Sequence, residues 1–176
     1  MDQPGLDENL HRQALTALRK VNRISATAWR LWRALRPLVA TDATRTWRVL
    51  DVASGGGDVA LALAAHARRA GCQLEVAGCD ISPTAIEFAQ SQARTAHALN
   101  VRFFEHDLLR DALPCDYDVV TCTLFLHHLD DADAELLLRR MRQAARHLTL
   151  LDDLRRTRLG YWLARLACRL LTRSPI

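Results

Sequence analysis

A glycine-rich segment and two later aspartates have the residue types that hold a nucleotide-type ligand. The segment from Asp51 to Gly57 reads DVASGGG. Glycines let a backbone approach a ligand closely, and the helix that follows presents free N–H groups. Asp80 could accept two hydrogen bonds from ribose hydroxyls. Asp107 could bind the amino group of an adenine ring, with Leu108 packed against that ring.

A fourth segment, TCTLFLHH from Thr121 to His128, ends in two adjacent histidines. Because histidine titrates near neutral pH, His127 or His128 could act as a general base and take a proton from a hydroxyl group. The structural alternative is that one histidine caps the next helix and the other packs. The cysteines form no CxxC pair. No Cys/His/carboxylate cluster has metal-ligand spacing, so we expect no metal site.

The elements that must position these side chains alternate in type. Compact apolar runs predict strands at residues 47–52, 73–79, 101–104, 117–123 and 147–151. Helical patterns lie between them, at residues 58–70, at 83–98 after the N-cap Ser82 and the first-turn Pro83, and from Asp130 or Asp131 to about 146. This alternation predicts βαβ units in a doubly wound α/β fold with a parallel sheet. Such sheets bind ligands beyond the carboxyl ends of their strands, where the four features above should meet.

The flanking regions are predicted to be helical. Leucines and tryptophans recur at helical spacing over residues 6–38, and Pro37 should end that helix. It either packs on the sheet or, as part of residues 1–40, forms a lid over the ligand site. The pattern of residues 154–171 predicts an amphipathic helix that carries several arginines. We expect its apolar stripe to cover the exposed sheet or a second subunit of a homodimer, and peripheral contact with an anionic membrane is the alternative.

The amino-acid composition limits the classes of protein to which this chain can belong. The 176 residues fit a single domain, 1–176, and the 49% hydrophobic and 25% charged residues are ordinary for a globular protein. No secretory signal and no apolar run of roughly 20 residues is visible, so we expect a cytoplasmic protein. The net charge of +4 comes from arginines spread along the chain. Dense basic tracts are missing, so we expect no nucleic-acid partner.

Four segments together resemble one family. VLDVASGGGD is similar to the glycine-rich motif of class I S-adenosylmethionine-dependent methyltransferases, and CDISPTAIEFA is similar to their acidic loop. EHDLL resembles their adenine loop, and YDVVTCTLFLHHL their fourth strand and its exit. The resemblance covers residues 45–152 in the family's order. It implies a Rossmann-like, mostly parallel sheet, S-adenosyl-L-methionine as cofactor, S-adenosyl-L-homocysteine as product, and a small-molecule acceptor.

The resemblance also implies roles for individual residues. Asp51 would attract the cofactor ammonium, often through water, and the glycine turn would line the cofactor's amino-acid part. Asp80 would hold the ribose with Ile81 against the adenine, and Thr123 would lie near the methionine moiety. The implied cofactor-binding set is Asp51, Ala53, Ser54, Gly55, Gly57, Asp80, Ile81, Asp107, Leu108 and Thr123.

Two departures from the family pattern bear on function. The family usually has glycine at the position of Ala53, and its quinone-biosynthesis branch tolerates alanine there. This favours a phenolic or quinone-like acceptor, with methylation of oxygen preferred over carbon. The family's sheet usually has seven strands, whereas five are expected here, followed only by the helix of residues 153–176. The last two strands are therefore missing, or a partner supplies that edge.

Two other functions stay open. The family's substrate pocket draws on its C-terminal part, so this chain could bind the cofactor without turnover. The turn also fits G-x-G-x-x-A at Gly55, Gly57 and Ala60, which is compatible with a nicotinamide-dependent oxidoreductase. Against the oxidoreductase, Asp51 precedes the glycines, where a dehydrogenase usually has an apolar residue. The one lysine, Lys20, also lies outside the sheet region.

Overall fold

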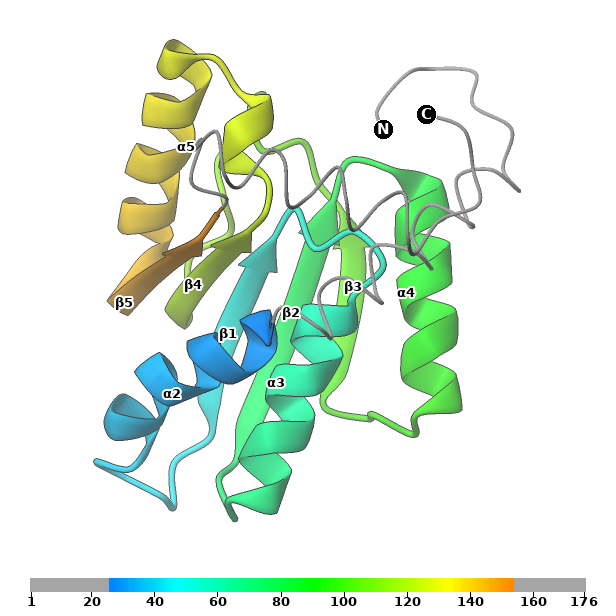
Figure 1. Cartoon of the computed structure of the whole chain (residues 1–176), viewed down its shortest axis with the longest axis vertical. Helices are drawn as coiled ribbons and strands as arrows, with labels where there is room; N and C mark the ends of the chain where they lie inside the picture. Colours follow the sequence, from blue (N-terminus) through cyan, green and yellow to red (C-terminus); the bar gives the residue numbers. More distant parts are fainter. Residues whose placement is uncertain (1–25, 154–176) are drawn as a thin grey trace.

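The computed structural model describes residues 26–153, whose strands form one parallel sheet with helices on both faces (Figure 1). The strands are β1 (Trp47–Val52), β2 (Leu74–Asp80), β3 (Val101–Glu105), β4 (Tyr117–Thr123) and β5 (Ala145–Asp152). The helices are α2 (Thr27–Val39), α3 (Asp58–Arg69), α4 (Pro83–Thr95) and α5 (Asp131–Ala144), with a 3-10 turn, η1 (Leu126–His128). The strand order across the sheet is β3-β2-β1-β4-β5.

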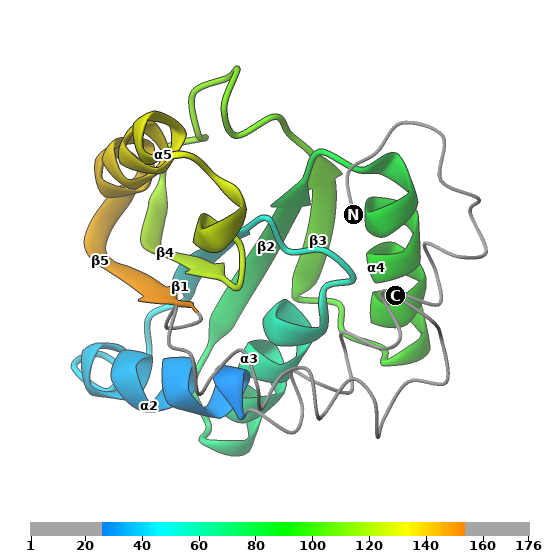
Figure 2. The ribbon, with the colours of Figure 1, turned by 45° about the horizontal axis from the view of Figure 1, so that its top comes forward.

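Two apolar clusters, one on each face of the sheet, hold the layers together. On one face, α2, α3 and α4 pack over the strands through residues such as Leu35, Leu63 and Ile86. On the other face, α5 packs through Leu137 and Met141 (Figure 2). Central parallel strands with both faces covered need apolar side chains on both sides. The runs that predicted β1 and β4 are accordingly buried almost throughout, and the doubly wound α/β fold is confirmed.

The parallel pairing brings the carboxyl ends of the strands to one edge of the sheet. Asp51 in β1 is aligned with Gly78 in β2 and with Thr121 in β4. Asp80, the last residue of β2, is aligned with Glu105, the last residue of β3. The residues singled out in the sequence therefore lie along the edge at which open α/β sheets bind ligands.

Two helices begin at side chains that cap them. The Ser82 hydroxyl accepts a hydrogen bond from Ala85 N at 3.2 Å, and Pro83 is the first residue of α4, as predicted. At α5 the cap is Asp130, whose Oδ1 accepts from Asp133 N at 2.9 Å. The first of the two candidate aspartates is therefore the cap.

Pro37 does not end the first helix, and that prediction was wrong. Helix α2 continues to Val39, and Ala40 N closes the last turn by donating to Arg36 O at 2.9 Å. Proline removes its own N–H, whose partner would be the Arg33 carbonyl. One missing bond in the final turn does not stop a helix that the following residues close.

Two other helices end earlier than predicted. Helix α4 stops at Thr95, and the chain then turns through His97, whose φ of 49° is left-handed. Helix α5 stops at Ala144 because β5 begins at Ala145, two residues ahead of the predicted start. The longer strand pairs with β4 up to the last residue of β4, so it reaches the ligand-binding edge.

The described part of the N-terminal helix packs on the sheet. Leu31, Trp32 and Leu35 of α2 are buried in the core, whereas Trp29 is 49% exposed. This is the amphipathic helix that the pattern predicts, and a lid formed by residues 1–40 stays a prediction. The predicted helical stretches at residues 6–25 and 154–171 lie outside the described residues.

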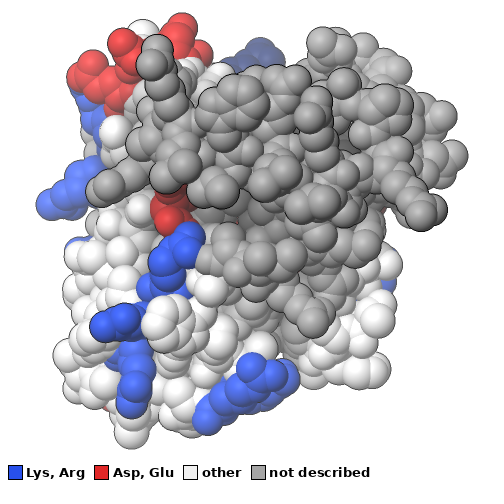
Figure 3. All heavy atoms as spheres, viewed as in Figure 1, with Lys and Arg blue, Asp and Glu red and all other residues white. Residues whose placement is uncertain are grey.

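The surface of the described part shows no dense basic tract on the face drawn in Figure 3. Basic side chains lie among uncharged atoms there, acidic ones gather at the corner where α5 begins, and a smaller acidic patch lies beside basic atoms near the middle of the view. The first turn of α5 carries Asp131 and Asp133. No helix within residues 26–153 is long and apolar enough to cross a membrane.

Candidate functional site

The glycine turn between β1 and α3 is fastened to the end of β2. Ser54 N donates to the Cys79 carbonyl at 2.9 Å, and Gly55 N donates to Asp80 Oδ2 at 2.8 Å. The turn closes on itself through Gly57 N, which donates to the Ser54 carbonyl at 2.9 Å. The loop predicted to line the cofactor's amino-acid part is thus joined directly to the carboxylate predicted to hold its ribose.

The turn uses left-handed backbone at three positions. The φ angles are 52° at Ala53, 50° at Gly55 and 75° at Gly57. Glycine adopts such angles freely, whereas the Cβ of an L-residue crowds the next carbonyl at a cost of roughly 1–2 kcal/mol. Ala53 therefore holds a strained conformation at the position where the resemblance expects glycine.

Two glycines near this edge make room for an aromatic ring. A Cβ on Gly57 would lie 2.4 Å from Phe103 Cζ, and one on Gly78 would lie 2.5 Å from Phe103 Cδ1. Phe103 in β3 is buried. The space that the missing side chain of Gly57 leaves is taken by Phe103, and the role of Gly57 in lining the cofactor stays a prediction.

Asp51 lies at the end of β1 as a buried carboxylate. It is 1% exposed, and its Oδ1 accepts a hydrogen bond from Thr121 Oγ1 at 2.8 Å. Its Oδ2 has no hydrogen-bond partner within the described part of the chain, and the same holds for the buried Ser54 Oγ. Burial is the main cause that raises the pKa of Asp51 to about 7; the Thr121 hydrogen bond opposes this rise, and the charges of Asp58 and Asp80 contribute to it.

Asp80 presents an oriented carboxylate at the same edge. Besides accepting from Gly55 N through Oδ2, it accepts from Ser82 N through Oδ1 at 3.0 Å. The next residue, Ile81, is 55% exposed. An oriented acid beside an exposed apolar side chain fits a ribose and the base attached to it.

Asp107 and Leu108 follow β3, as predicted, but both side chains also make contacts that stabilise the fold. Asp107 Oδ1 accepts from Leu109 N and from Arg110 N, both at 3.0 Å, which shapes the turn after the strand. Leu108 is 5% exposed and belongs to the apolar cluster under α5. Little of its side chain is left to pack against an adenine ring.

The exit of β4 brings His127 to a carboxylate and places His128 beside it. Leu124, with φ 52°, turns the chain out of β4 and into η1. Asp153 directly follows β5; it accepts from His127 N at 3.1 Å and lies 2.7 Å from His127 Nδ1. The ring centroids of His127 and His128 are 4.0 Å apart. Thr123, predicted near the methionine moiety, is the last residue of β4 and is half-buried.

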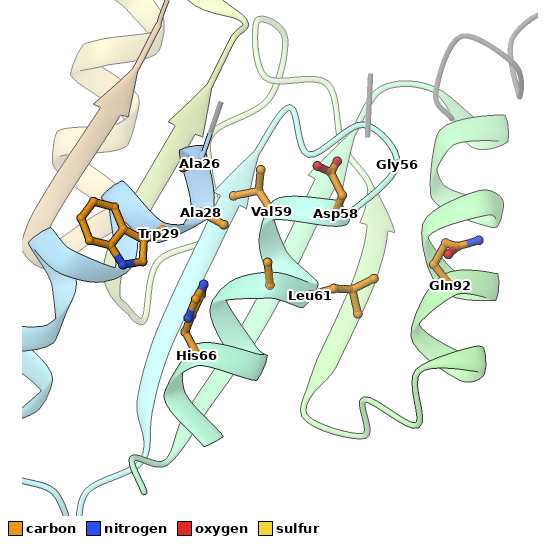
Figure 4. A pocket seen from close by; sticks show the side chains of 10 residues that line it. Ala26, Ala28, Trp29, Gly56, Asp58, Val59, Leu61, His66 and Gln92 are labelled. Carbon is orange, nitrogen blue, oxygen red and sulfur yellow. The ribbon is translucent and has the colours of Figure 1, made fainter. Parts of the chain in front are cut away.

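A cavity of about 400 Å³ lies beside this edge, on the face covered by α2, α3 and α4. Trp29 of α2, His66 of α3 and Gln92 of α4 line it, as Figure 4 shows, and Gly56 joins it to the glycine turn. Its lining includes none of the three aspartates predicted to bind the cofactor. The cavity therefore flanks the predicted cofactor site and does not form it.

Three residues of this edge were missed by sequence reasoning. Gly78 and Phe103 support the glycine turn from β2 and β3, and Asp153 holds His127. A glycine inside a predicted strand was a usable signal for the first pair, because it often marks a close approach. Within residues 26–153 no group of three or more His, Cys, Asp and Glu side chains could hold a metal ion.

Solved methyltransferase structures share this fold. The magnesium protoporphyrin IX methyltransferase of Synechocystis PCC 6803 with bound S-adenosylhomocysteine gives a TM-score of 0.64 at 21% identity, over 99% of this chain and 71% of that one. The S-adenosylmethionine-dependent methyltransferase SibL gives a TM-score of 0.57 at 30% identity, over 77% of this chain and 41% of that one. The first likeness, at its low identity, concerns the fold alone.

Sequence relatives agree with the structural ones. The demethylmenaquinone methyltransferase of Deinococcus radiodurans is 39% identical over 85 residues, which are 48% of this chain and 33% of that relative. This chain spans about a third of the length of the curated relatives that it matches. The model of the methyltransferase domain family matches residues 49–147, more than half of the chain. The chain therefore belongs to the methyltransferase domain family.

Proposed function

We propose that this chain binds S-adenosylmethionine at the carboxyl edge of its sheet and transfers the methyl group to a small acceptor with a phenolic or quinol-type hydroxyl. The observation that carries the proposal is the buried Asp51 carboxylate, whose Oδ2 has no hydrogen-bond partner among the described residues. Leaving a buried acceptor unsatisfied costs about 1–3 kcal/mol. The ammonium group of the cofactor's amino-acid part, directly or through water, would supply the missing donor.

The neighbouring residues fit the rest of the cofactor. Ser54 Oγ, also buried and without a described partner, would bond the amino-acid part. Asp80, oriented by Gly55 N and Ser82 N, would accept from the ribose hydroxyls, and the exposed Ile81 would pack on the adenine. When bound, the cofactor supplies a methyl group on a positively charged sulfur that is already activated for displacement.

Positioning of the acceptor is the larger catalytic contribution that this site would make. Holding the acceptor oxygen in line with the methyl group and the leaving sulfur can contribute roughly 7–11 kcal/mol. General base catalysis typically adds about 10²–10⁴-fold in rate, or roughly 3–5 kcal/mol. The protein therefore needs a shaped acceptor site first and a base second.

The acceptor class is proposed from two further points. One curated relative is a demethylmenaquinone methyltransferase, which favours a quinone-like acceptor for this chain. Ala53 at the usual glycine position points the same way through the resemblance to the quinone-biosynthesis branch. We favour methylation of an oxygen, and methylation of a ring carbon activated by a neighbouring oxyanion is the nearest variant.

Calorimetric titration with S-adenosylmethionine, S-adenosylhomocysteine and NADH tests the proposal. We expect micromolar binding of both adenosyl compounds and none of NADH, followed by methyl transfer to a reduced 1,4-naphthoquinone. Binding without transfer to any phenol or quinol would indicate a cofactor-binding protein without turnover. Binding of NADH alone would replace the proposal with a nicotinamide-dependent oxidoreductase.

A further inference from the structure

Both carboxylate oxygens of Asp153 contact His127. Its Oδ2 accepts from His127 N at 3.1 Å, and its Oδ1 lies 2.7 Å from His127 Nδ1. The Asp153 side chain is 12% exposed, and that of His127 is 25% exposed. This two-point contact fixes the position of the carboxylate and the rotation of the imidazole ring together.

The sheet brings these two residues together across 26 positions of sequence. Strands β4 and β5 pair up to the last residue of each, and Leu124 N then donates to the Asp152 carbonyl at 2.9 Å. Asp152, the last paired residue of β5, and Asp153, which follows it, have different partners. Asp152 Oδ2 lies 2.6 Å from Arg30 Nη2 of α2, whereas Asp153 faces the turn that carries His127.

The carboxylate determines which ring nitrogen carries the proton. An ionised carboxylate can only accept hydrogen bonds, so Nδ1 must be the donor, and Nε2 of the neutral ring is then the acceptor. We propose that Asp153 is a positioning residue that holds His127 in the Nδ1–H tautomer, so that His127 Nε2 takes the proton of the acceptor hydroxyl. This inference rests on the proposed function.

The same geometry distinguishes the two histidines, either of which could be the general base on the sequence alone. The His128 ring packs beside that of His127, with ring planes 39° apart, and its centroid lies 6.3 Å from that of the Phe125 ring. His128 thus lies against the ring that Asp153 orients. We assign the base to His127 and a packing role to His128.

Proton transfer to His127 accompanies methyl transfer to the acceptor. The acceptor O–H bond breaks, its proton goes to His127 Nε2, and the electron pair stays on the oxygen. That oxygen, or a ring carbon conjugated with it, forms the new bond to the methyl carbon. The methyl–sulfur bond breaks with its electron pair going to sulfur, which leaves neutral S-adenosylhomocysteine and an imidazolium whose proton passes to water.

The first test is the tautomer itself, which needs no turnover. Two-bond proton–nitrogen spectra of the full-length protein at mildly alkaline pH report which nitrogen of each neutral imidazole is protonated, and His127→Gln identifies the His127 signals. We expect protonated Nδ1 in the wild type and a shift toward protonated Nε2 in Asp153→Asn. A wild-type His127 protonated on Nε2 would overturn the proposal.

The second test compares the change in kcat with the changes in KM and Kd, with reduced 1,4-naphthoquinone as the methyl acceptor. We expect Asp153→Asn to lower kcat at least about tenfold, with less than about a threefold change in the KM of the naphthoquinol and in the Kd of S-adenosylmethionine. The control is Asp116→Asn, which removes a carboxylate paired with Arg146 at the opposite end of the sheet. An unchanged kcat in Asp153→Asn would contradict the positioning role.

The two tests separate this inference from the proposed function. A wild type that neither binds S-adenosylmethionine nor methylates the naphthoquinol contradicts the proposed function, while the ring spectra still decide the tautomer. A wild type that turns over normally but has the wrong tautomer contradicts the Asp153 inference alone.

Discussion

Thr121 Oγ1 donates to Asp51 Oδ1 at 2.8 Å between neighbouring strands, and this bond leaves Asp51 Oδ2 buried without a partner in the described part of the chain. The two residues are aligned in the β1–β4 pairing, so the sheet itself sets their distance. A single hydrogen bond from a neutral hydroxyl does not compensate for the burial of a charge. Asp51 is therefore a residue whose charge state depends on what binds next to it.

Asp51→Asn should change how stability depends on pH. The folded-state pKa of about 7 lies above the ordinary aspartate value of 3.8, so the group's contribution to stability is present at low pH and is lost as pH rises through about 7. Wild type should therefore lose about 2–3 kcal/mol from this group between about pH 5 and pH 8, whereas Asp51→Asn should not. Urea unfolding at both pH values measures the difference.

The matched control for that experiment is Asp116→Asn. Asp116 is exposed and pairs with Arg146 at 2.6 Å. Asp116 directly precedes β4, at the end of the sheet away from Asp51, so the loss of stability assigned to Asp51 should persist in Asp116→Asn. Parallel profiles for wild type and Asp51→Asn as well would show that Asp51 does not titrate as proposed.

Cofactor affinity should weaken as pH falls. The ammonium group of S-adenosylmethionine favours ionised Asp51, and protonation of a carboxyl with a pKa of about 7 opposes that contact. We expect the Kd to rise roughly fifteenfold from pH 7 to about pH 5.5, because the ionised fraction falls by about that factor. Calorimetry in two buffers of different ionisation enthalpy should also detect proton release on binding. A pH-independent Kd, equal in wild type and Asp51→Asn, would exclude the Asp51 contact.

Ala53→Gly should stabilise the protein. Ala53 adopts φ 52°, where glycine has no Cβ to crowd. Relief of this strain, less the extra entropy that glycine loses on folding, should add about 0.5–1 kcal/mol to the free energy of unfolding. The control is Ala65→Gly inside α3, which should lower stability by about 1 kcal/mol. Equal losses in both variants would mean that position 53 is not strained.

Gly78→Ala should destabilise the fold through Phe103. Its Cβ would lie 2.5 Å from Phe103 Cδ1 and 2.8 Å from Ser54 Oγ, and overpacking of a core costs about 1–3 kcal/mol. Phe103→Leu in the same chain should recover part of that loss. Thermal and urea unfolding of the two single variants and the double variant gives the coupling free energy between positions 78 and 103. Strict additivity would show that the ring and the glycine do not meet.

The sheet was predictable from sequence because its strands are buried on both faces. Apolar runs marked β1 and β4 with the observed bounds, and the glycine turn and Asp80 followed from their places after strands. Parallel topology then put these residues at one edge. This part of the site depends only on local sequence and on the direction of the strands.

The remaining features depend on contacts that no local pattern contains. The contact of His127 with Asp153 requires the β4–β5 register, and the role of Gly78 as space for Phe103 requires the β2–β3 register. The continuation of α2 past Pro37 depends on a bond that Ala40 makes after it. Sequence reasoning located the edge but not the packing that supports it.

The most direct test of the account is calorimetric titration of wild type, Asp80→Ala and Glu75→Ala with S-adenosylmethionine. Asp80 and the exposed Glu75 lie in β2 at its carboxyl-terminal and amino-terminal ends, so they form a matched pair of acids. We predict micromolar binding in wild type and Glu75→Ala, and binding at least about tenfold weaker in Asp80→Ala, which loses charge-assisted hydrogen bonds to the ribose. Equal affinity in all three proteins, or no binding in any, would contradict a cofactor site at this edge of the sheet.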